Sequence, residues 1–363
     1  MNQAIHGGNI REAAQQFGRD PQELIDFSSN LNIWIDPILP DAAETWREIT
    51  RYPEVDAMTF RQQLASIYAV PSADLLPTAG AAEALYLAMR LLNGKRVGIV
   101  EPAYGDYSRA CRAAGVTYSP IQLAPEEWFS SIITYVDRLK EFEVIVLGNP
   151  NNPTGNLHSR TDLIEVLCRF PDKIFMVDEA FIEFVENHSE ETLSPVLAAF
   201  PSLIIIGSLT KSWRVPGLRL GFIATSNSRW IEQAALFQPP WSINALAQLW
   251  AKHNLSPDGY ERMQRSLAGL PGLRKKFVAQ LQQLSQLIVH AGSANFLMLE
   301  LRTVQAMELY HYLGQQGFLV RLCDSFAGVP SNRFIRVAVR HEQENADLVS
   351  HIRNFFGVQS TCL

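Results

Sequence analysis

Lys211 lies in a segment whose residue types suit covalent chemistry on a phosphorylated aldehyde. It follows the apolar run 203–207, so we expect it just beyond the end of a buried strand. A lysine amine in such a place can lose its proton by desolvation and form a Schiff base with a carbonyl. Ser208, Thr210 and Arg219 surround it in the sequence, and hydroxyls and guanidinium groups bind phosphate. Pyridoxal 5'-phosphate (PLP) is an aldehyde with a phosphate, so the segment predicts a PLP site, although by itself it fits a solvated surface lysine equally well.

Two further strand ends supply groups that PLP would need. Asp178 ends the apolar run 174–177, and a carboxylate at the C-terminal end of a parallel strand faces the crevice where open α/β sheets bind ligands. Such a carboxylate favours the protonated ring nitrogen of PLP. Asn152 lies in the rigid turn 149–155, where its amide can contact the ring hydroxyl oxygen. A helix cap and an ordinary turn are the alternatives, but three strand ends in this order predict one pocket.

These segments resemble those of fold-type I PLP enzymes in the aspartate aminotransferase superfamily, on the branch with histidinol-phosphate aminotransferases. The resemblance rests on Asn-Asn-Pro-Thr-Gly at 151–155, Asp-Glu-Ala at 178–180 and the stretch 208–219. Other segments are similar to threonine-phosphate decarboxylases of cobalamin synthesis, and together they cover nearly the whole chain. These segments are 6–14, 26–32, 240–247 and 336–340. The resemblance implies decarboxylation of O-phospho-L-threonine to aminopropanol phosphate, and the alternative is an aminotransferase for histidinol phosphate or a related amino acid.

The resemblance also implies the remaining cofactor contacts. Small residues stand where a helix begins, and backbone amides at a helix N-terminus bind phosphate. Superfamily members are often richer in glycine here, so the stretch 78–82 departs from the pattern and puts side-chain contacts in doubt. The amides of Gly80, Ala81 and Ala82 stay available for the phosphate. Tyr104 matches the aromatic residue that stacks on the pyridine ring, with an ordinary core tyrosine as the alternative. Tyr52 matches a tyrosine that reaches the cofactor phosphate of the partner in a homodimer.

Substrate contacts follow from the same resemblance. Arg336 matches an arginine that pairs with an amino-acid carboxylate, and Arg321 matches one that binds a substrate phosphate. His6, Asn32 and Asn244 are further candidates for that end of the pocket, and His6 could serve the neighbouring subunit. O-Phosphothreonine carries both a carboxylate and a phosphate, which suits two arginines. Histidinol phosphate together with a carboxylate-bearing amino acceptor suits them as well.

Phe181 favours the decarboxylase. Aminotransferases of this branch typically have a tyrosine three residues after the aspartate that pairs with the pyridinium, where its hydroxyl meets the cofactor oxygen. Here that position is a phenylalanine, as in decarboxylase-like members. The loss of the hydroxyl leaves Asn152 as the main partner of that oxygen. This interpretation is consistent with a changed reaction and does not decide it.

Composition narrows the class of protein. The chain has 363 residues, of which 47% are hydrophobic and 19% charged, which is ordinary for a soluble enzyme of two domains. A net charge of -6 argues against a nucleic-acid surface. The four cysteines are dispersed without a C-x-x-C pair and indicate reduced thiols, and no apolar stretch reaches the roughly 20 residues that span a bilayer. Composition therefore favours a cytoplasmic enzyme without metal, nucleic-acid or membrane sites, and the resemblance implies a small phosphorylated amino acid as its substrate.

Apolar runs alternate with helical stretches in the middle of the chain, which predicts a mostly parallel sheet flanked by helices. The expected strands are 97–100, 144–147, 174–177, 203–206 and 220–224, and the clearest helical stretches are 81–92 and 159–170. After Trp241 we expect one long helical region and then strands near 295–301, 318–322 and 334–339.

The resemblance implies an α/β fold with two domains. Residues 45–240 would form the large PLP-binding domain, and residues 1–44 and 241–363 would form an N-terminal arm and a smaller α+β domain. Residues 1–44 are too short to hold both this arm and the DNA-binding module of a PLP-binding regulator, which disfavours a sensor function.

Overall fold

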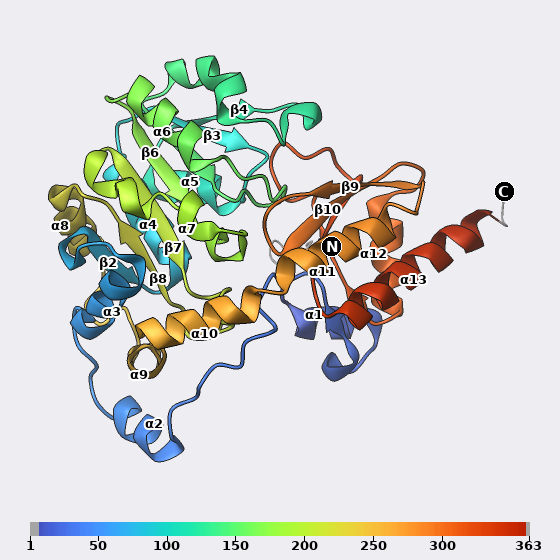
Figure 1. The fold of residues 1–363 in the computed structure, drawn as a ribbon, viewed down its shortest axis with the longest axis horizontal. Helices are drawn as coiled ribbons and strands as arrows, with labels where there is room; N and C mark the ends of the chain where they lie inside the picture. Colours follow the sequence, from blue (N-terminus) through green and yellow to red (C-terminus); the bar gives the residue numbers. More distant parts are fainter. Residues whose placement is uncertain (1–6, 361–363) are drawn as a thin grey trace.

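The computed structural model describes residues 7–360 and is built around a large central sheet (Figure 1). Its seven strands are, in spatial order, β2 (Leu75–Thr78), β8 (Gly221–Ala224), β7 (Leu203–Ser208), β6 (Ile174–Asp178), β5 (Val144–Gly148), β3 (Val97–Glu101) and β4 (Tyr118–Gln122). The strands from β7 to β4 pair in parallel, whereas β8 runs antiparallel to both of its neighbours. The mostly parallel sheet predicted from the alternating pattern is therefore confirmed.

Helices cover both faces of this sheet, which explains the continuous apolar runs of its strands. In β7, Ile204 and Ile206 belong to one buried cluster, while Leu203 and Ile205 belong to the other. The first cluster includes residues of α4 (Gly80–Leu91), α5 (Asp106–Ala114) and α8 (Ser228–Phe237). The second includes residues of α3 (Met58–Tyr68), α6 (Arg160–Arg169) and α9 (Ala245–Asn254).

A second, antiparallel sheet forms from the C-terminal part of the chain. Its strands are, in spatial order, β12 (Arg321–Leu322), β13 (Phe334–Ala338), β10 (Phe296–Leu301) and β9 (Leu287–Ala291). Three helices accompany it: α11 (Leu270–Leu281), α12 (Ala306–Gln315) and α13 (Glu342–Ser360). Near the start of the chain, β1 (Ile25–Asp26) pairs in parallel with β11 (Phe318–Leu319), which places the N-terminal segment beside this sheet. The domain boundaries at residues 45 and 240 stay a prediction.

The structure also contains four other α-helices and several 3₁₀ segments. The helices are α1 (Ile10–Phe17), α2 (Ala42–Ile49), α7 (His188–Glu191) and α10 (Pro257–Leu267), and the 3₁₀ segments are η1 (Pro21–Glu23), η2 (Ser72–Asp74), η3 (Pro125–Glu127), η4 (Ile132–Glu141), η5 (Ile182–Phe184) and η6 (Ser194–Ala199). Within residues 7–360, no helix combines the length and the apolar character needed to cross a membrane.

Two of the sequence-based expectations about elements are wrong. The long helical region after Trp241 is three helices, α9, α10 and α11, because Ser256 caps α10 at Pro257 and Pro271 stands in the first turn of α11. The segment 318–322 is two short strands in different sheets rather than one strand.

Candidate active site

The carboxyl ends of β5, β6 and β7 meet at one edge of the large sheet. Gly148 pairs with Asp178, the last residue of β6, and Asp178 also pairs with Ile206 in β7. β7 ends at Ser208, and the turn that carries Lys211 follows directly. The sequence-predicted residues Asp178, Ser208 and Lys211 therefore lie at the same edge, as parallel strand ends require.

The amine of Lys211 is held in an environment that favours its neutral form. Its Nζ lies 4.6 Å from the centre of the Phe181 ring. Burial, with a smaller contribution from the guanidinium groups of Arg336 and Arg219, lowers the pKa of Lys211 to about 8, although the carboxylate of Asp178 acts in the opposite direction. These three charged side chains are thus close enough to act on the amine. A lysine with a pKa of about 8 has a usable neutral fraction near neutral pH and can act as a nucleophile.

The carboxylate of Asp178 is fixed from two sides. Its Oδ2 accepts a 2.8 Å hydrogen bond from the Tyr107 hydroxyl, and its Oδ1 accepts a 2.9 Å bond from the amide of Ala180. Burial raises the pKa of Asp178, whereas the charge of Lys211 and these two hydrogen bonds lower it. A buried, oriented carboxylate of this kind fits a cationic ring nitrogen.

The first turn of α4 forms an anion cradle with Arg219. Gly80 has a φ of +82°, and a Cβ at this position would lie 2.9 Å from Nη2 of Arg219. At Gly221, where β8 begins, a Cβ would lie 2.5 Å from the amide nitrogen of Ala81. The helix cap residue Ala79 offers no side-chain hydrogen bond to the first amides. These amides and the adjacent guanidinium fit a phosphate group.

The other predicted phosphate contacts lie beside this cradle. Ser208 is the cross-strand partner of Gly221, so the end of β7 adjoins the start of α4. Thr210 lies in the turn after β7, and its hydroxyl is 3.5 Å from the carbonyl oxygen of Leu220. Ala82 belongs to the same first helical turn as Ala81. The structure therefore brings these predicted residues together, while their contacts with phosphate stay a prediction.

Tyr104 is anchored near the same charges. Its hydroxyl donates a 2.8 Å hydrogen bond to Oδ2 of Asp106, and its ring meets the Tyr107 ring edge-on at 5.7 Å. Burial is the main cause that raises the pKa of Tyr104, and the charges of Asp178 and Arg219 also act on it. The aromatic ring therefore lies beside the groups predicted to hold PLP, where stacking on a flat cofactor is geometrically reasonable.

Two buried arginines face the site from the antiparallel sheet. Arg321 in β12 and Arg336 in β13 are direct cross-strand partners, and they are only 6% and 5% exposed. Arg336 donates one hydrogen bond to Oδ1 of Asn152 and another, of 2.9 Å, to the carbonyl oxygen of Ser28. Burial and the charge of Arg321 lower the pKa of Arg336 to about 10. Two positive charges directly opposite each other in a buried place attract anions, so this pair is suited to bind an anionic ligand.

The remaining predicted residues have other neighbours. The Asn32 side chain donates 2.8 Å bonds to the Ser212 carbonyl and the Ser266 hydroxyl, and Asn244 caps α9 by accepting from the Ala247 amide. The predicted substrate contacts of Asn32 and Asn244 stay predictions. Tyr52 is 82% exposed and packs against the Trp241 ring at 4.8 Å. The prediction for His6 falls outside the described residues.

Sequence reasoning missed two residues that the structure adds. The Tyr107 hydroxyl donates a hydrogen bond to Asp178, and its only signal in the sequence was its position three residues after Tyr104, where α5 begins. Asn30 is buried, and its Oδ1 has no hydrogen-bond partner within residues 7–360. It lies two residues after Ser28, whose carbonyl binds Arg336, and is a further candidate for the substrate end of the site.

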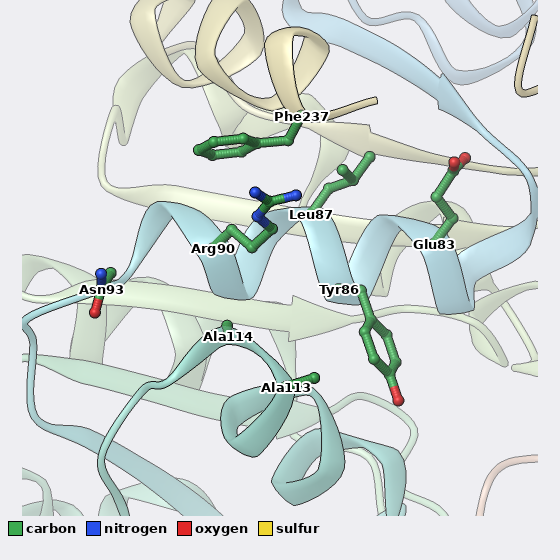
Figure 2. A pocket seen from close by; sticks show the side chains of 8 residues that line it. All are labelled: Glu83, Tyr86, Leu87, Arg90, Asn93, Ala113, Ala114 and Phe237. Carbon is green, nitrogen blue, oxygen red and sulfur yellow. The ribbon is translucent and has the colours of Figure 1, made fainter. Parts of the chain in front are cut away.

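A surface hollow of about 560 Å³ lies between α4 and the C-terminal ends of α5 and α8 (Figure 2). It is lined by Glu83, Tyr86, Leu87, Arg90, Asn93, Ala113, Ala114 and Phe237. The guanidinium of Arg90 lies 4.1 Å from the centre of the Phe237 ring, which narrows the hollow. None of the predicted site residues lines it, so the hollow is separate from the predicted cofactor and substrate site.

The clustered side chains match the chemical groups of PLP one by one. Lys211 suits the aldehyde, Asp178 suits the ring nitrogen, and the first turn of α4 with Arg219 suits the phosphate. Asn152, which Arg336 orients, is available for the ring hydroxyl oxygen. The residues present therefore fit this cofactor.

Comparison with known proteins agrees with the geometry. The family model for class I and II aminotransferases matches residues 24–352. A threonine-phosphate decarboxylase of Salmonella typhimurium is 32% identical, and the alignment covers 97% of this chain and 96% of that protein.

Solved structures give the same picture. The L-threonine-O-3-phosphate decarboxylase of Porphyromonas gingivalis superposes with a TM-score of 0.78 at 27% identity, covering 87% of this chain and 93% of its own. The histidinol-phosphate aminotransferase of Clostridium acetobutylicum superposes with a TM-score of 0.83 at 26% identity, covering 92% of this chain and 99% of its own. This chain belongs to the class I and II aminotransferases, a family of PLP-dependent enzymes.

Proposed function

We propose that this enzyme decarboxylates O-phospho-L-threonine to aminopropanol phosphate, with PLP bound at Lys211. The observation that carries the proposal is the opposed pair of buried guanidiniums, Arg321 and Arg336. O-Phosphothreonine offers one anionic group to each of these two like charges at the same time, whereas histidinol phosphate and a carboxylate-bearing acceptor would use them in turn. The similarity to decarboxylases named for this substrate supports the same choice.

Bound PLP supplies an electron sink for the electron pair that remains when a bond to the substrate Cα breaks. The protein decides which bond breaks by orienting the substrate. Arg336 takes the carboxylate through its planar fork, and Asn152 and Ser28 hold that guanidinium in place. Arg321 takes the phosphate and thereby fixes rotation of the substrate about the Cα–N bond. Positioning of this kind raises the rate by lowering the entropic part of the barrier.

The side chains of Lys211 and Asp178 hold or transfer protons. The amine of Lys211, with its pKa lowered to about 8, exchanges a proton near neutral pH and can deliver one to Cα. The carboxylate of Asp178 holds a proton at the ring nitrogen, and the Tyr107 hydroxyl keeps that carboxylate oriented. Phe181 places a ring without a hydroxyl 4.6 Å from Nζ of Lys211, so this side chain offers no hydrogen bond there.

The second candidate function is an aminotransferase for histidinol phosphate or a related amino acid. It is favoured by relatives with that name, such as a protein of Ruminiclostridium cellulolyticum that is 25% identical and is covered over 84% of each chain. Such an enzyme requires a keto-acid acceptor, whereas the decarboxylase requires none. The chemistry at Lys211 would be shared, so the fate of the substrate carboxylate separates the two.

The deciding experiment omits the acceptor. Purified protein is incubated with PLP and O-phospho-L-threonine in the absence of any keto acid, and carbon dioxide and aminopropanol phosphate are measured. Release of both products in equal amounts supports the decarboxylase. A parallel incubation contains histidinol phosphate and 2-oxoglutarate. If O-phospho-L-threonine gives no products without a keto acid, and histidinol phosphate is consumed only when 2-oxoglutarate is present, the aminotransferase is the correct function.

We also propose that the enzyme is a homodimer and that it is located in the cytoplasm. Tyr52 and Trp241 form an exposed aromatic pair, and exposed Leu39, Trp46 and Val55 come from the same stretch of chain as Tyr52. Exposed apolar residues in such number are typical of an interface, and a second copy of the chain is the partner that the predicted role of Tyr52 requires. Analytical ultracentrifugation of the holoenzyme tests the dimer: a monomer at micromolar concentration with full activity contradicts it.

A further inference from the structure

Helix α10 is bonded to the turn that carries Lys211. The Asn32 side chain donates 2.8 Å hydrogen bonds to the hydroxyl of Ser266 in α10 and to the carbonyl oxygen of Ser212. The backbone amide of Asn32 donates a 2.9 Å bond to the carbonyl oxygen of Lys211 itself. Asn32 therefore connects the last turn of α10 to the turn that carries Lys211.

The same helix is bonded to the turn that follows Asp178. Glu183 lies in η5, two residues after Phe181, and its Oε2 accepts hydrogen bonds from the Tyr260 hydroxyl at 3.0 Å and from Nε2 of Gln264 at 2.6 Å. Tyr260 and Gln264 are one turn apart and so project from the same face of α10. Nε2 of His188 lies 3.6 Å from the same carboxylate oxygen. Glu183 thus joins α10 to the segment that carries Phe181.

Glu183 is a buried carboxylate, which is an unusual choice of residue where only packing is needed. Glu183 is 4% exposed, and its Oε1 has no hydrogen-bond partner within residues 7–360. Burial and then the charge of Glu183 raise the pKa of Tyr68 in α3, and burial followed by the charges of Glu183 and Asp178 raises the pKa of Glu179 to about 7. A buried charge costs several kcal/mol, whereas an apolar side chain would pack here at lower cost. Buried polar groups of this kind can fix one arrangement of neighbouring segments.

We propose that Glu183 is a positioning residue, through which α10 sets the placement of Asp178 and Phe181 relative to Lys211. The inference rests on the PLP site proposed above. α10 leads directly into α11, which packs against α13 and β9 of the antiparallel sheet (Figure 1). Helices α10 and α11 therefore connect the antiparallel sheet, which carries Arg321 and Arg336, to the turn with Lys211 and to the segment with Phe181.

The test compares two buried glutamates. Glu183→Gln keeps the shape of the side chain but removes its charge. Glu300→Gln is the matched control, because Glu300 is 7% exposed and pairs with His290 at 3.0 Å and with Arg333, within the antiparallel sheet and without a bond to α10. For each holoenzyme without substrate, the visible absorbance of the lysine-bound cofactor is followed against pH, together with Tm and steady-state kinetics.

Glu183→Gln should move the midpoint of that pH titration upward by about half a unit or more, which is roughly a threefold change in proton affinity. The direction follows because a neutral amide accepts the hydrogen bonds from Tyr260 and Gln264 more weakly than a carboxylate does, so α10 packs less tightly and water enters. Water stabilises the charged, protonated form that burial disfavours. The kcat should fall several-fold. Glu300→Gln should lower Tm and leave the midpoint unchanged, since it loosens a region away from Lys211.

Tyr260→Phe provides a milder variant that removes one donor to Glu183, and it should shift the midpoint in the same direction by a smaller amount. The proposal is overturned if Glu183→Gln and Tyr260→Phe lower Tm while the midpoint and kcat stay at wild-type values. If Glu183→Gln does not fold, Tyr260→Phe alone decides by the same criterion. Because the absorbance titration needs no substrate, a wrong substrate assignment would leave its result intact.

Discussion

Replacing Tyr107 with phenylalanine measures how strongly the buried carboxylate of Asp178 depends on its hydrogen bond. Tyr107 is buried, and its hydroxyl lies 2.8 Å from Oδ2 of Asp178. A hydrogen bond to a charged group contributes about 1.5–3 kcal/mol. Since one pKa unit corresponds to about 1.36 kcal/mol, the loss of this bond should raise the pKa of Asp178 by roughly one to two units.

The sign of the effect on activity follows from the role of the carboxylate. Asp178 is useful in its ionised form, so a higher pKa means that activity is lost at a higher pH as the solution is acidified. The acidic limb of kcat/KM against pH should therefore move upward by about one to two units in Tyr107→Phe, while the alkaline limb stays in place. The affinity for PLP, titrated by absorbance at neutral pH, should fall by roughly tenfold or more.

Tyr135→Phe is the matched control for this experiment. Tyr135 is also buried, and its hydroxyl lies 3.0 Å from Nε2 of His158 rather than near the lysine. It should lower Tm by an amount similar to Tyr107→Phe and leave the acidic limb unchanged. An acidic limb for Tyr107→Phe that coincides with that of the wild type would refute the assigned role of the hydrogen bond.

Three further outcomes are expected. Gly80→Ala should weaken PLP binding by about tenfold in an absorbance titration, because the new Cβ would lie 2.9 Å from Arg219 at a φ of +82°; unchanged affinity would exclude this first helical turn from the phosphate site. Arg321→Met should raise KM for the phosphorylated substrate by roughly 10- to 100-fold, because it removes the proposed partner of the phosphate. Tm should not fall, because the substitution also removes a like charge opposite Arg336. An equal rise in KM for an unphosphorylated amino acid would contradict phosphate binding. In apoenzyme, the rate of PLP capture should rise with pH and level off above about pH 8, the lowered pKa of Lys211, because the neutral amine is the nucleophile; a rise that continues toward pH 10 would show an ordinary lysine.

Much of the sheet edge formed by the carboxyl ends of β5, β6 and β7 was predictable, because its functional residues lie at the ends of apolar runs in the sequence. Asp178 is the last residue of β6 and Ser208 is the last residue of β7, and both strands are recognisable in the sequence as continuous apolar runs. The pairing of these two strands brings their ends together. The helix of 81–92 was predicted within one residue at each end. In contrast, β2 and β4 were missed, because Pro77 and Pro120 interrupt their sequences. Proline is tolerated there because both strands lie at the edges of the sheet.

The contacts that depend on packing between distant segments could not be predicted. Tyr107 reaches Asp178 across 71 positions of sequence, and nothing in the local pattern separates it from an ordinary core tyrosine. The Asn32 side chain donates a hydrogen bond to the carbonyl oxygen of Ser212, 180 positions away, and only the folded chain reveals this contact. The facing of Arg321 and Arg336 likewise depends on the register between two strands.

The identity of the lysine that binds PLP is the most direct test of this site. The holoenzyme is reduced with borohydride, which makes the lysine–cofactor bond permanent, and is then digested and analysed by mass spectrometry. We predict that the phosphopyridoxyl group is found on the peptide that contains Lys211 and that Lys211→Ala loses both this adduct and the visible absorbance of the bound cofactor. An adduct on a different lysine, or a normal absorbance in Lys211→Ala, would contradict the assignment.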